Sequence, residues 1–205
     1  MNLNIIEELK LEQGTPEWHA ARAGWVTASE LSSLMAKGEG KTRAKYMRQL
    51  AAEQLLGRSA ASFTGNVYTE MGKEYEPKAR QLLCEELGVE ISETGVVRNH
   101  EVGMSCSPDG LIGTDEMAEF KCCIPTVQIE RLEKGTLPTE YAMQVQGSLL
   151  VTGRKACWFQ SYSPDLPRLV VRVEPDYAKH AEIRAAVTLF RTELAELVKS
   201  IRSKY

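Results

Sequence analysis

The sequence predicts one α/β domain in which helices flank a central mixed β-sheet. Its 205 residues are 43% hydrophobic, which suffices for one sizeable core. Segments with helical periodicity come first, a run of strand-like segments follows, and helices and strands then alternate. No Pro- or Gly-rich linker and no internal repeat divides the chain, so we expect residues 1–205 to form a single unit.

Helices are predicted throughout the first half of the chain. Thr15 and Pro16 occupy the capping and first positions of a helix over residues 16–23. A long amphipathic helix ends at Gly88, a residue suited to the left-handed turn that closes helices. This long helix covers residues 69–87. Two further helices are predicted, one that begins at residues 27–30 and one over residues 43–56.

The second half combines strands with two further helices. Strands are expected over residues 89–99, 104–112, 117–123, 156–163 and 169–173, and a helix over residues 140–152. Residues 176–202 form a closing helix with an apolar stripe of Ile183, Val187, Phe190, Leu194, Leu197 and Ile201. The sequence leaves open whether this helix packs on the core, on a neighbouring subunit or on a partner.

Composition excludes several classes of protein. A net charge of −3 argues against indiscriminate coating of nucleic acid, although it allows local binding. No run of about 18 apolar residues exists, so we expect no membrane span, and the acidic N-terminus is unlike a secretory signal. The five cysteines form no C-x-x-C pair, which favours free thiols in a reducing cytoplasm over zinc or iron–sulfur ligation.

Asp109, Glu119 and Lys121 are the main candidates for catalysis. Asp109 lies in a Pro-Asp-Gly turn at the end of a predicted strand, and a second turn brings the chain back along the next strand. Side chains two apart in a strand share a face, so Glu119 and Lys121 point together while Phe120 faces the core. An acidic pocket beside a lysine suits a hard divalent cation such as Mg²⁺.

The flanks of these residues favour a buried site. Asp and Glu-x-Lys are common combinations, and by themselves they are better explained by chance or by surface salt bridges. Here apolar or small residues surround them, and carboxylates in such surroundings are costly unless a cation neutralises them. This arrangement resembles the active-site signature of the restriction-endonuclease-like nuclease superfamily, which implies a core of that fold.

A basic segment is a candidate for contacts with the DNA backbone. It begins in a Gly-containing loop and continues into a predicted helix, and an ordinary solvated helix face is the alternative interpretation. Its candidate residues are Lys37, Lys41, Arg43 and Lys45.

Arg22, Thr27 and Ser29 are candidates for binding a terminal phosphate. An arginine fork beside hydroxyls and the free N–H groups of a helix start can hold such a group. Ordinary helix capping with a surface arginine explains the same residues.

Two predicted helices carry further candidates. Glu76 can project toward the metal site, although a surface carboxylate near Lys73 and Arg80 is the alternative. Tyr141 and Gln144 lie three apart and share a helix face, and Gln144 is suited to orienting water or Lys121 unless it is an ordinary surface amide.

In order along the chain, these segments resemble the lambda-type phage alkaline exonucleases, also called YqaJ-like viral recombinase nucleases. The resemblance covers residues from about 16 to about 162. It rests on Arg-x-Gly-x-x-Thr-Ala-Ser, Gly-x-x-x-Glu, Ser-Pro-Asp-Gly, Glu-x-Lys and Tyr-x-x-Gln-x-Gln. Residues 1–13 and those after 163 carry no matching motif.

The resemblance implies a processive 5′→3′ exonuclease that acts on double-stranded DNA ends, releases 5′-mononucleotides and leaves a 3′ overhang for single-strand annealing. It implies two Mg²⁺ ions per site, replaceable by Mn²⁺, a homotrimeric ring, a single-strand annealing protein as partner and a phage or prophage gene expressed in the bacterial cytoplasm. By this resemblance, Asp109, Glu119 and the Phe120 carbonyl would hold the metal, and Glu76 would complete the acidic cluster. Lys121 would position the attacking water, with Tyr141 and Gln144 supporting the site. The 5′-phosphate would be bound by Arg22, Thr27 and Ser29.

Two other functions stay open at this point. An endonuclease can use the same fold and the same signature. A non-catalytic module that binds DNA ends can keep the fold without the reaction, although the presence of Asp109, Glu119 and Lys121 counts against it.

Overall fold

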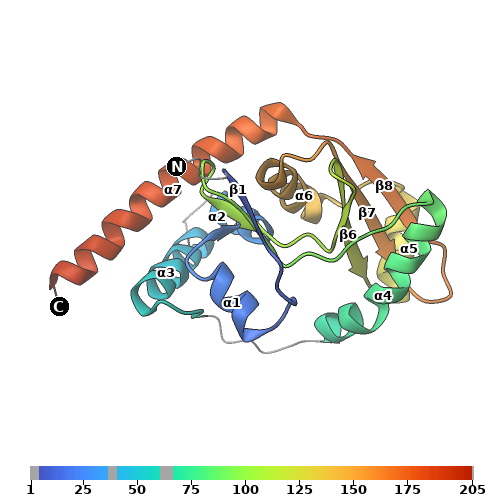
Figure 1. Ribbon diagram of the computed structural model, residues 1–205, viewed down its shortest axis with the longest axis horizontal. Coiled ribbons are helices and arrows are strands. Elements are labelled where there is room, and N and C mark those ends of the chain that lie inside the picture. Colours follow the sequence, from blue (N-terminus) through green and yellow to red (C-terminus); the bar gives the residue numbers. More distant parts are fainter. Residues whose placement is uncertain (1–4, 37–40, 61–66, 205) are drawn as a thin grey trace.

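The computed structural model describes residues 5–36, 41–60 and 67–204, and for residues 67–70 and 73 only the backbone (Figure 1). The α/β class is confirmed, and the described strands form two four-stranded sheets where one central sheet was expected. Their orders are β1-β3-β4-β2 and β5-β6-β7-β8. The described residues contain no helix with both the length and the apolar character needed to cross a bilayer.

A short proline-containing link separates the two sheets. The expected strand over residues 104–112 is in fact two strands, β4 (Met104–Cys106) and β5 (Gly110–Ile112), with Ser107, Pro108 and Asp109 between them. Proline cannot donate a hydrogen bond to a sheet ladder, so pairing stops there and the chain passes from one sheet to the other.

The first sheet contains two strands that were not predicted. They are β1 (Ile6–Leu9) and β2 (Val26–Thr27), and β3 (Val96–Asn99) is shorter than the strand expected over residues 89–99. Gly95 precedes β3, and a Cβ there would lie 2.4 Å from the backbone nitrogen of Leu11. The backbone that leads out of β1 therefore passes too close to residue 95 for any side chain.

The second sheet is built around β6 (Glu116–Cys122). It pairs antiparallel with β5 and parallel with β7 (Ala156–Tyr162), and β7 pairs antiparallel with β8 (Leu169–Val173). Ala118 and Phe120 pack against α4 (Val67–Leu87), whereas Met117, on the opposite face, packs with α6 (Thr139–Thr152). The alternation along β6 thus directs Glu119 and Lys121 toward α6.

Most of the predicted helices lie close to their expected bounds. Thr15 caps α1 (Pro16–Arg22) by accepting a hydrogen bond from the Trp18 N–H at 3.3 Å. A 3₁₀ turn (Ala28–Glu30) precedes α2 (Leu31–Leu34), and α3 covers Lys41–Leu56. The helix α5 (Pro125–Lys134) was missed, although it starts with proline and ends at Gly135 in a left-handed conformation.

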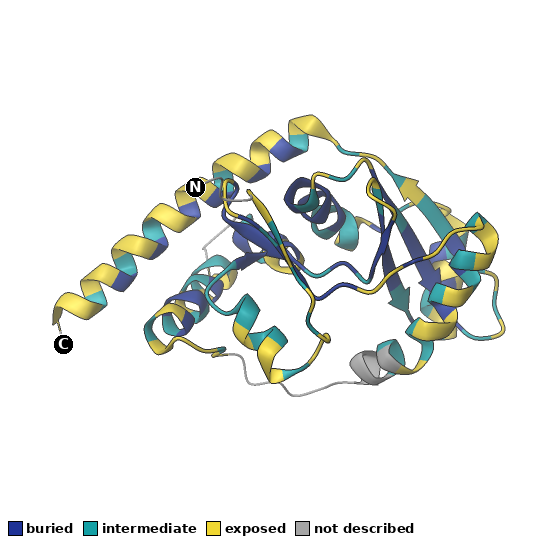
Figure 2. Cartoon of the chain, viewed as in Figure 1, coloured by how far each residue is buried: buried dark blue, intermediate teal, exposed yellow. Residues whose placement is uncertain are grey.

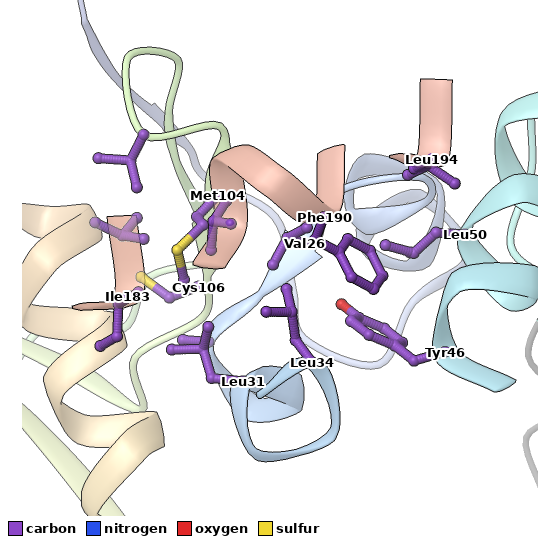
Figure 3. Packing of buried hydrophobic residues seen from close by; sticks show 14 of the residues in the cluster. Val26, Leu31, Leu34, Tyr46, Leu50, Met104, Cys106, Ile183, Phe190 and Leu194 are labelled. Carbon is purple, nitrogen blue, oxygen red and sulfur yellow. The ribbon is translucent and has the colours of Figure 1, made fainter. Parts of the chain in front are cut away.

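The closing helix α7 (Tyr177–Lys204) packs on the core of its own chain, which answers the question left open by the sequence. Its predicted stripe up to Leu197 lies against α2, α3 and the first sheet, with Phe190 stacked on Tyr46 at 5.6 Å between ring centroids (Figure 3). Ile201 lies outside this cluster, and Val198, which was not predicted, is buried in it. The outer face of the helix is exposed (Figure 2). As expected, all five cysteines are free thiols.

Phe190 should contribute strongly to stability, because its ring is fully buried. We expect Phe190→Ala to lower the free energy of unfolding by roughly 3–5 kcal/mol, measured by urea denaturation. Leu189→Ala is the control, since Leu189 is 58% exposed and its loss should change stability by only about 0.5 kcal/mol. Equal losses in the two variants would contradict this account of how α7 packs.

Candidate active site

Asp109 stands at the junction of the two sheets, directly before β5. Its Oδ2 accepts a hydrogen bond from the Phe120 N–H at 2.6 Å, which fixes the carboxylate against β6. The neighbouring Gly110 lets Ile91 pack directly against this turn, because a Cβ there would lie 2.2 Å from Cγ2 of Ile91. The Pro-Asp-Gly turn predicted from the sequence therefore delivers a carboxylate to the middle of the second sheet.

Glu119 and Lys121 meet on the face of β6 that was predicted for them. The Lys121 Nζ lies 2.5 Å from Oε1 of Glu119, whose side chain is only 3% exposed. The Gln144 amide from α6 donates to the same Oε1. A buried carboxylate is thus compensated by one cation and one neutral donor.

Arg80 connects Glu76 to the Asp109 turn. Its guanidinium donates to Oε1 of Glu76 at 2.7 Å and to the backbone carbonyl of Asp109 at 2.5 Å. Glu76 therefore makes the surface-type pair with Arg80 that the sequence offered as an alternative, and the same pair also holds it beside the site. No role in the site was predicted for Arg80 from its place in the sequence.

The carboxylates of the site resist ionisation. Burial, with the charge of Asp109 as the next cause, raises the pKa of Glu119 to about 7 and that of Glu76 to about 7. Burial also raises the pKa of Asp109. Burial alone would lower the pKa of Lys121, but the charges of Glu119 and Asp109 outweigh it and raise that pKa. The pKa values of the carboxylates stay raised because the positive charges of Lys121 and Arg80 do not fully offset burial and the repulsion among the carboxylates.

A hard divalent cation fits this donor set, because carboxylate oxygens are its preferred ligands and its charge would relieve the repulsion. Among the described residues, no group of three or more His, Cys, Asp or Glu side chains is arranged to hold a metal ion as it stands. Glu119 is engaged by Lys121 and Gln144, and Glu76 by Arg80. Metal binding would therefore exchange these contacts, and the ligand roles of Asp109, Glu119 and the Phe120 carbonyl stay predictions.

Tyr141 and Gln144 both reach the site from α6, as their spacing suggested. The centroid of the Tyr141 ring lies 5.3 Å from the Lys121 Nζ, within the range of cation–π contact. Gln146 points away from the site: its amide binds the Glu174 carbonyl and the Asp176 N–H, which holds the chain that leads into α7.

Arg22 and Ser29 lie together in a pocket of about 190 Å³. The Arg22 guanidinium donates to Oγ of Ser29 at 3.4 Å and to Oγ of Ser107 at 2.9 Å, and it stacks over the Trp18 ring at 4.3 Å. The Thr27 hydroxyl lies 3.3 Å from that of Ser29. The pocket is lined in addition by His19, Trp25, Tyr46, Gln49 and Glu53.

Ser107 joins this pocket to the carboxylates. It contacts Arg22 and the Trp18 indole N–H, and it stands two residues before Asp109. Neither Ser107 nor Trp18 was proposed from the sequence as a site residue. Ser107 belongs to the Ser-Pro-Asp-Gly signature, but which side of that turn faces the arginine is a property of the folded chain.

The basic segment is only partly visible. Lys37 lies outside the described residues, and Lys41 and Lys45 are exposed near the start of α3. Arg43 has an internal role, because its guanidinium pairs with Glu193 of α7 at 2.7 Å and lies over the Phe190 ring. Contact of these residues with DNA stays a prediction.

Comparisons with known proteins identify the family and the fold of the chain. Residues 17–155 match the YqaJ-like viral recombinase domain. The structure of the alkaline exonuclease LHK-Exo from Laribacter hongkongensis superposes with a TM-score of 0.84 at 35% identity, covering 93% of this chain and 97% of that chain. The same enzyme in complex with dAMP gives a TM-score of 0.85 at 35% identity with the same coverage.

A more distant structure shares the fold alone. It is a phage related exonuclease from Haemophilus somnus 129PT, with a TM-score of 0.65 at 17% identity, covering 95% of this chain and 97% of that chain. No curated protein matches the chain.

The metal-free protein should lose stability as its buried carboxylates ionise. The pKa of Glu119 is about 7 in the folded protein against an ordinary 4.5, so the folded state binds the proton more tightly and stability falls as pH rises from about 4.5 to about 7. We expect the Tm of the wild type in EDTA to fall relative to that of Glu119→Gln over this window. Lys121 is protonated throughout, so it does not contribute to the difference in slope.

Adding Mg²⁺ at pH 8, where the carboxylates are ionised, should raise the Tm of the wild type and leave that of Glu119→Gln nearly unchanged. Parallel Tm curves for the two proteins without metal, together with no response to Mg²⁺, would contradict the electrostatic account of the cluster.

Proposed function

Because the chain belongs to the YqaJ-like viral recombinase domain family, we propose that it is a metal-dependent 5′→3′ exonuclease that acts on the ends of double-stranded DNA. The observation that carries the proposal is the connection between two sites. The Arg22 pocket and the carboxylate–lysine cluster are joined through Ser107 and Asp109, two residues apart. The 35% identity with an alkaline exonuclease supports the nuclease class.

The Arg22 pocket would supply the preference for DNA ends. A terminal 5′-phosphate presents more free oxygens than an internal phosphodiester, and the guanidinium with the Ser29 and Thr27 hydroxyls can donate to them. Residues two apart in an extended chain lie about 7 Å apart, which is comparable to the spacing of successive DNA phosphates. A phosphate at Arg22 would thus place the next one near Asp109, and each cut would release a 5′-mononucleotide.

The residues of the cluster would have separate roles in hydrolysis. Asp109, Glu119 and the Phe120 carbonyl would hold the metal, with Glu76 available for a second ion. When bound, Mg²⁺ or Mn²⁺ supplies Lewis-acid polarisation of the phosphate and lowers the pKa of bound water.

Lys121 would act as a hydrogen-bond donor. The charges of Glu119 and Asp109 raise its pKa, so it stays protonated and would place the attacking water and offset developing negative charge. Gln144 would keep the Glu119 carboxylate oriented when Lys121 turns to the substrate.

The family context extends the proposal beyond a single chain. A nuclease of phage-type recombination would leave a 3′ single-stranded overhang for a single-strand annealing protein. A homotrimeric ring around the DNA would make hydrolysis processive. The setting we propose is the cytoplasm of a bacterial host that carries the phage or prophage gene.

Hydrolysis of linear duplex DNA labelled on one strand, with or without a 5′-phosphate and with Mg²⁺, tests the activity. We expect mononucleotides from phosphorylated 5′ ends, and a loss of roughly 10²–10³-fold in kcat for Lys121→Ala, because a donor to the reacting phosphate is gone. A thermal melt of the variant checks that it is folded. Cutting of a closed circle would indicate an endonuclease, and end binding without hydrolysis a non-catalytic module.

Arg22→Gln should chiefly weaken the recognition of ends. We expect the preference for 5′-phosphate over 5′-hydroxyl to fall at least about tenfold, through KM more than kcat, because a charge-assisted contact to the terminal phosphate is lost. Arg184→Gln is the matched control, since Arg184 on α7 pairs with Glu101 and takes no part in the pocket. An unchanged phosphate preference in Arg22→Gln would remove this residue from end recognition.

A further inference from the structure

Arg131, near the end of α5, is a buried cation that the mechanism above does not use. Its side chain is only 8% exposed. One guanidinium nitrogen donates to Oγ of Ser161 on β7 at 3.0 Å, and the other donates to the Tyr141 hydroxyl at 2.8 Å. Its carboxylate partner, Glu140, is 3.5 Å away and largely exposed, so this pair is a weak compensation for the buried charge.

Tyr141 stands between Arg131 and the catalytic lysine. Its ring centroid lies 5.1 Å from the Arg131 Cζ and 5.3 Å from the Lys121 Nζ. The ring also packs against Phe159 at 5.4 Å between centroids, and Phe159 is the β7 partner of Glu119 in the register. The ring is therefore held by Phe159 on the sheet and by Arg131 at its hydroxyl, and Lys121 lies beside it.

The hydrogen bond between Arg131 and Tyr141 can run in only one direction. A guanidinium can only donate, so the tyrosine oxygen accepts from Arg131 and its own proton stays available for another acceptor. Rotation of the tyrosine about its side-chain bonds would break this contact. Arg131 thus fixes both the position of the ring beside Lys121 and the side from which the hydroxyl donates.

A purely structural role explains Arg131 less well. Ser161 is already held by Gln128, whose Oε1 accepts its hydroxyl at 2.6 Å and whose amide binds the Ser161 carbonyl at 3.2 Å. Packing at this point does not need a cation, and burying one is costly. What only Arg131 supplies is a fixed donor to the hydroxyl of Tyr141.

We propose that Arg131 is a positioning residue of the active site, which acts through Tyr141 to hold the Lys121 ammonium in place. The inference rests on the exonuclease activity proposed above. It assigns to α5, a helix without any motif of the nuclease signature, a part in the reaction.

Steady-state kinetics of the full-length protein on 5′-phosphorylated duplex tests the proposal. Arg131→Met keeps an unbranched apolar stem but removes the guanidinium, and it should lower kcat about tenfold with little change in KM, because the site is misaligned while the DNA contacts remain. Tyr141→Phe removes the accepting oxygen without touching α5 and should cause a similar loss. The double variant should be no worse than either single variant, because both break one contact.

Glu140→Gln is the matched control. It changes the other polar partner of Arg131 and should leave kcat within about twofold, because that partner is largely exposed. Should Arg131→Met fail to fold, Arg131→Lys, which keeps a cation but cannot bridge Ser161 and Tyr141, takes its place and should still lower kcat. Wild-type kcat in folded Arg131 variants or in Tyr141→Phe, or additive losses in the double variant, would overturn the proposal.

A second measurement does not depend on activity. In ¹H–¹³C spectra of lysine-labelled protein, the Lys121 side-chain signal, assigned with Lys121→Arg, reports the nearby aromatic ring. Arg131→Met should shift it and Glu140→Gln should not. An unmoved signal in Arg131→Met would overturn the proposal. If the wild type hydrolyses no DNA, the exonuclease assignment fails, while the signal still decides whether Arg131 positions Lys121.

Discussion

The ion pair between Glu119 and Lys121 is the interaction on which the arrangement of the second sheet and α6 depends. A carboxylate that is 3% exposed cannot stay charged without partners, and its partners come from two different elements. Lys121 follows it on β6, and Gln144 reaches it from α6. Helix α6 is therefore held in register with the sheet by a polar contact as well as by its apolar face. On the far side, Arg80 ties α4 to the second sheet, because it donates to the Asp109 carbonyl directly before β5 and pairs with Glu76 of its own helix. The apolar face of α4 packs against β5 and β6.

The division of β6 into two faces makes this charge tolerable. Ala118 and Phe120 close the core against α4, so the polar face carries Glu119 and Lys121 without exposing the apolar one. Beyond the ion pair, the polar face continues into aromatic side chains: the Tyr141 ring lies beside the Lys121 ammonium and packs against Phe159, and it offers the ammonium no competing hydrogen bond. Attraction between charges is stronger in such surroundings than at an open surface.

Local patterns predicted the elements whose signals are local. The Thr15 cap, most of the apolar stripe of α7 and the shared face of Glu119 and Lys121 follow from spacing alone, and the structure has them. Long-range contacts could not be predicted in this way. The strands β1 and β2 are short, and they are strands only because they pair with β3 and β4. The separation into two sheets depends on the interruption of strand pairing at Pro108. Helix α5 was missed in spite of its proline start and glycine end, because its apolar residues are few.

The same distinction applies to the site. Asp109, Glu76 and Arg22 were proposed from separate motifs. They come together because the Ser107 hydroxyl accepts from Arg22 and the Arg80 guanidinium donates to the Asp109 carbonyl, and these partners are far apart in the sequence. Arg43 shows the limit of predictions from charge patterns, because a cation in a basic segment can pair with a carboxylate of its own chain, here Glu193 at a partly exposed position, as readily as with a phosphate of DNA.

The link of Ser107, Pro108 and Asp109 belongs to neither sheet, yet it joins the pocket on one to the carboxylates on the other. Its length is set by covalent bonds, the ring of Pro108 locks one of its torsions, and the Gln13 amide binds the Pro108 carbonyl at 3.0 Å. In the proposed exonuclease, the distance between the phosphate bound by Arg22 and the phosphate that is cut would therefore be fixed by the covalent length of this link. A mutation that loosens either core would then slow cleavage without changing how many nucleotides each step removes.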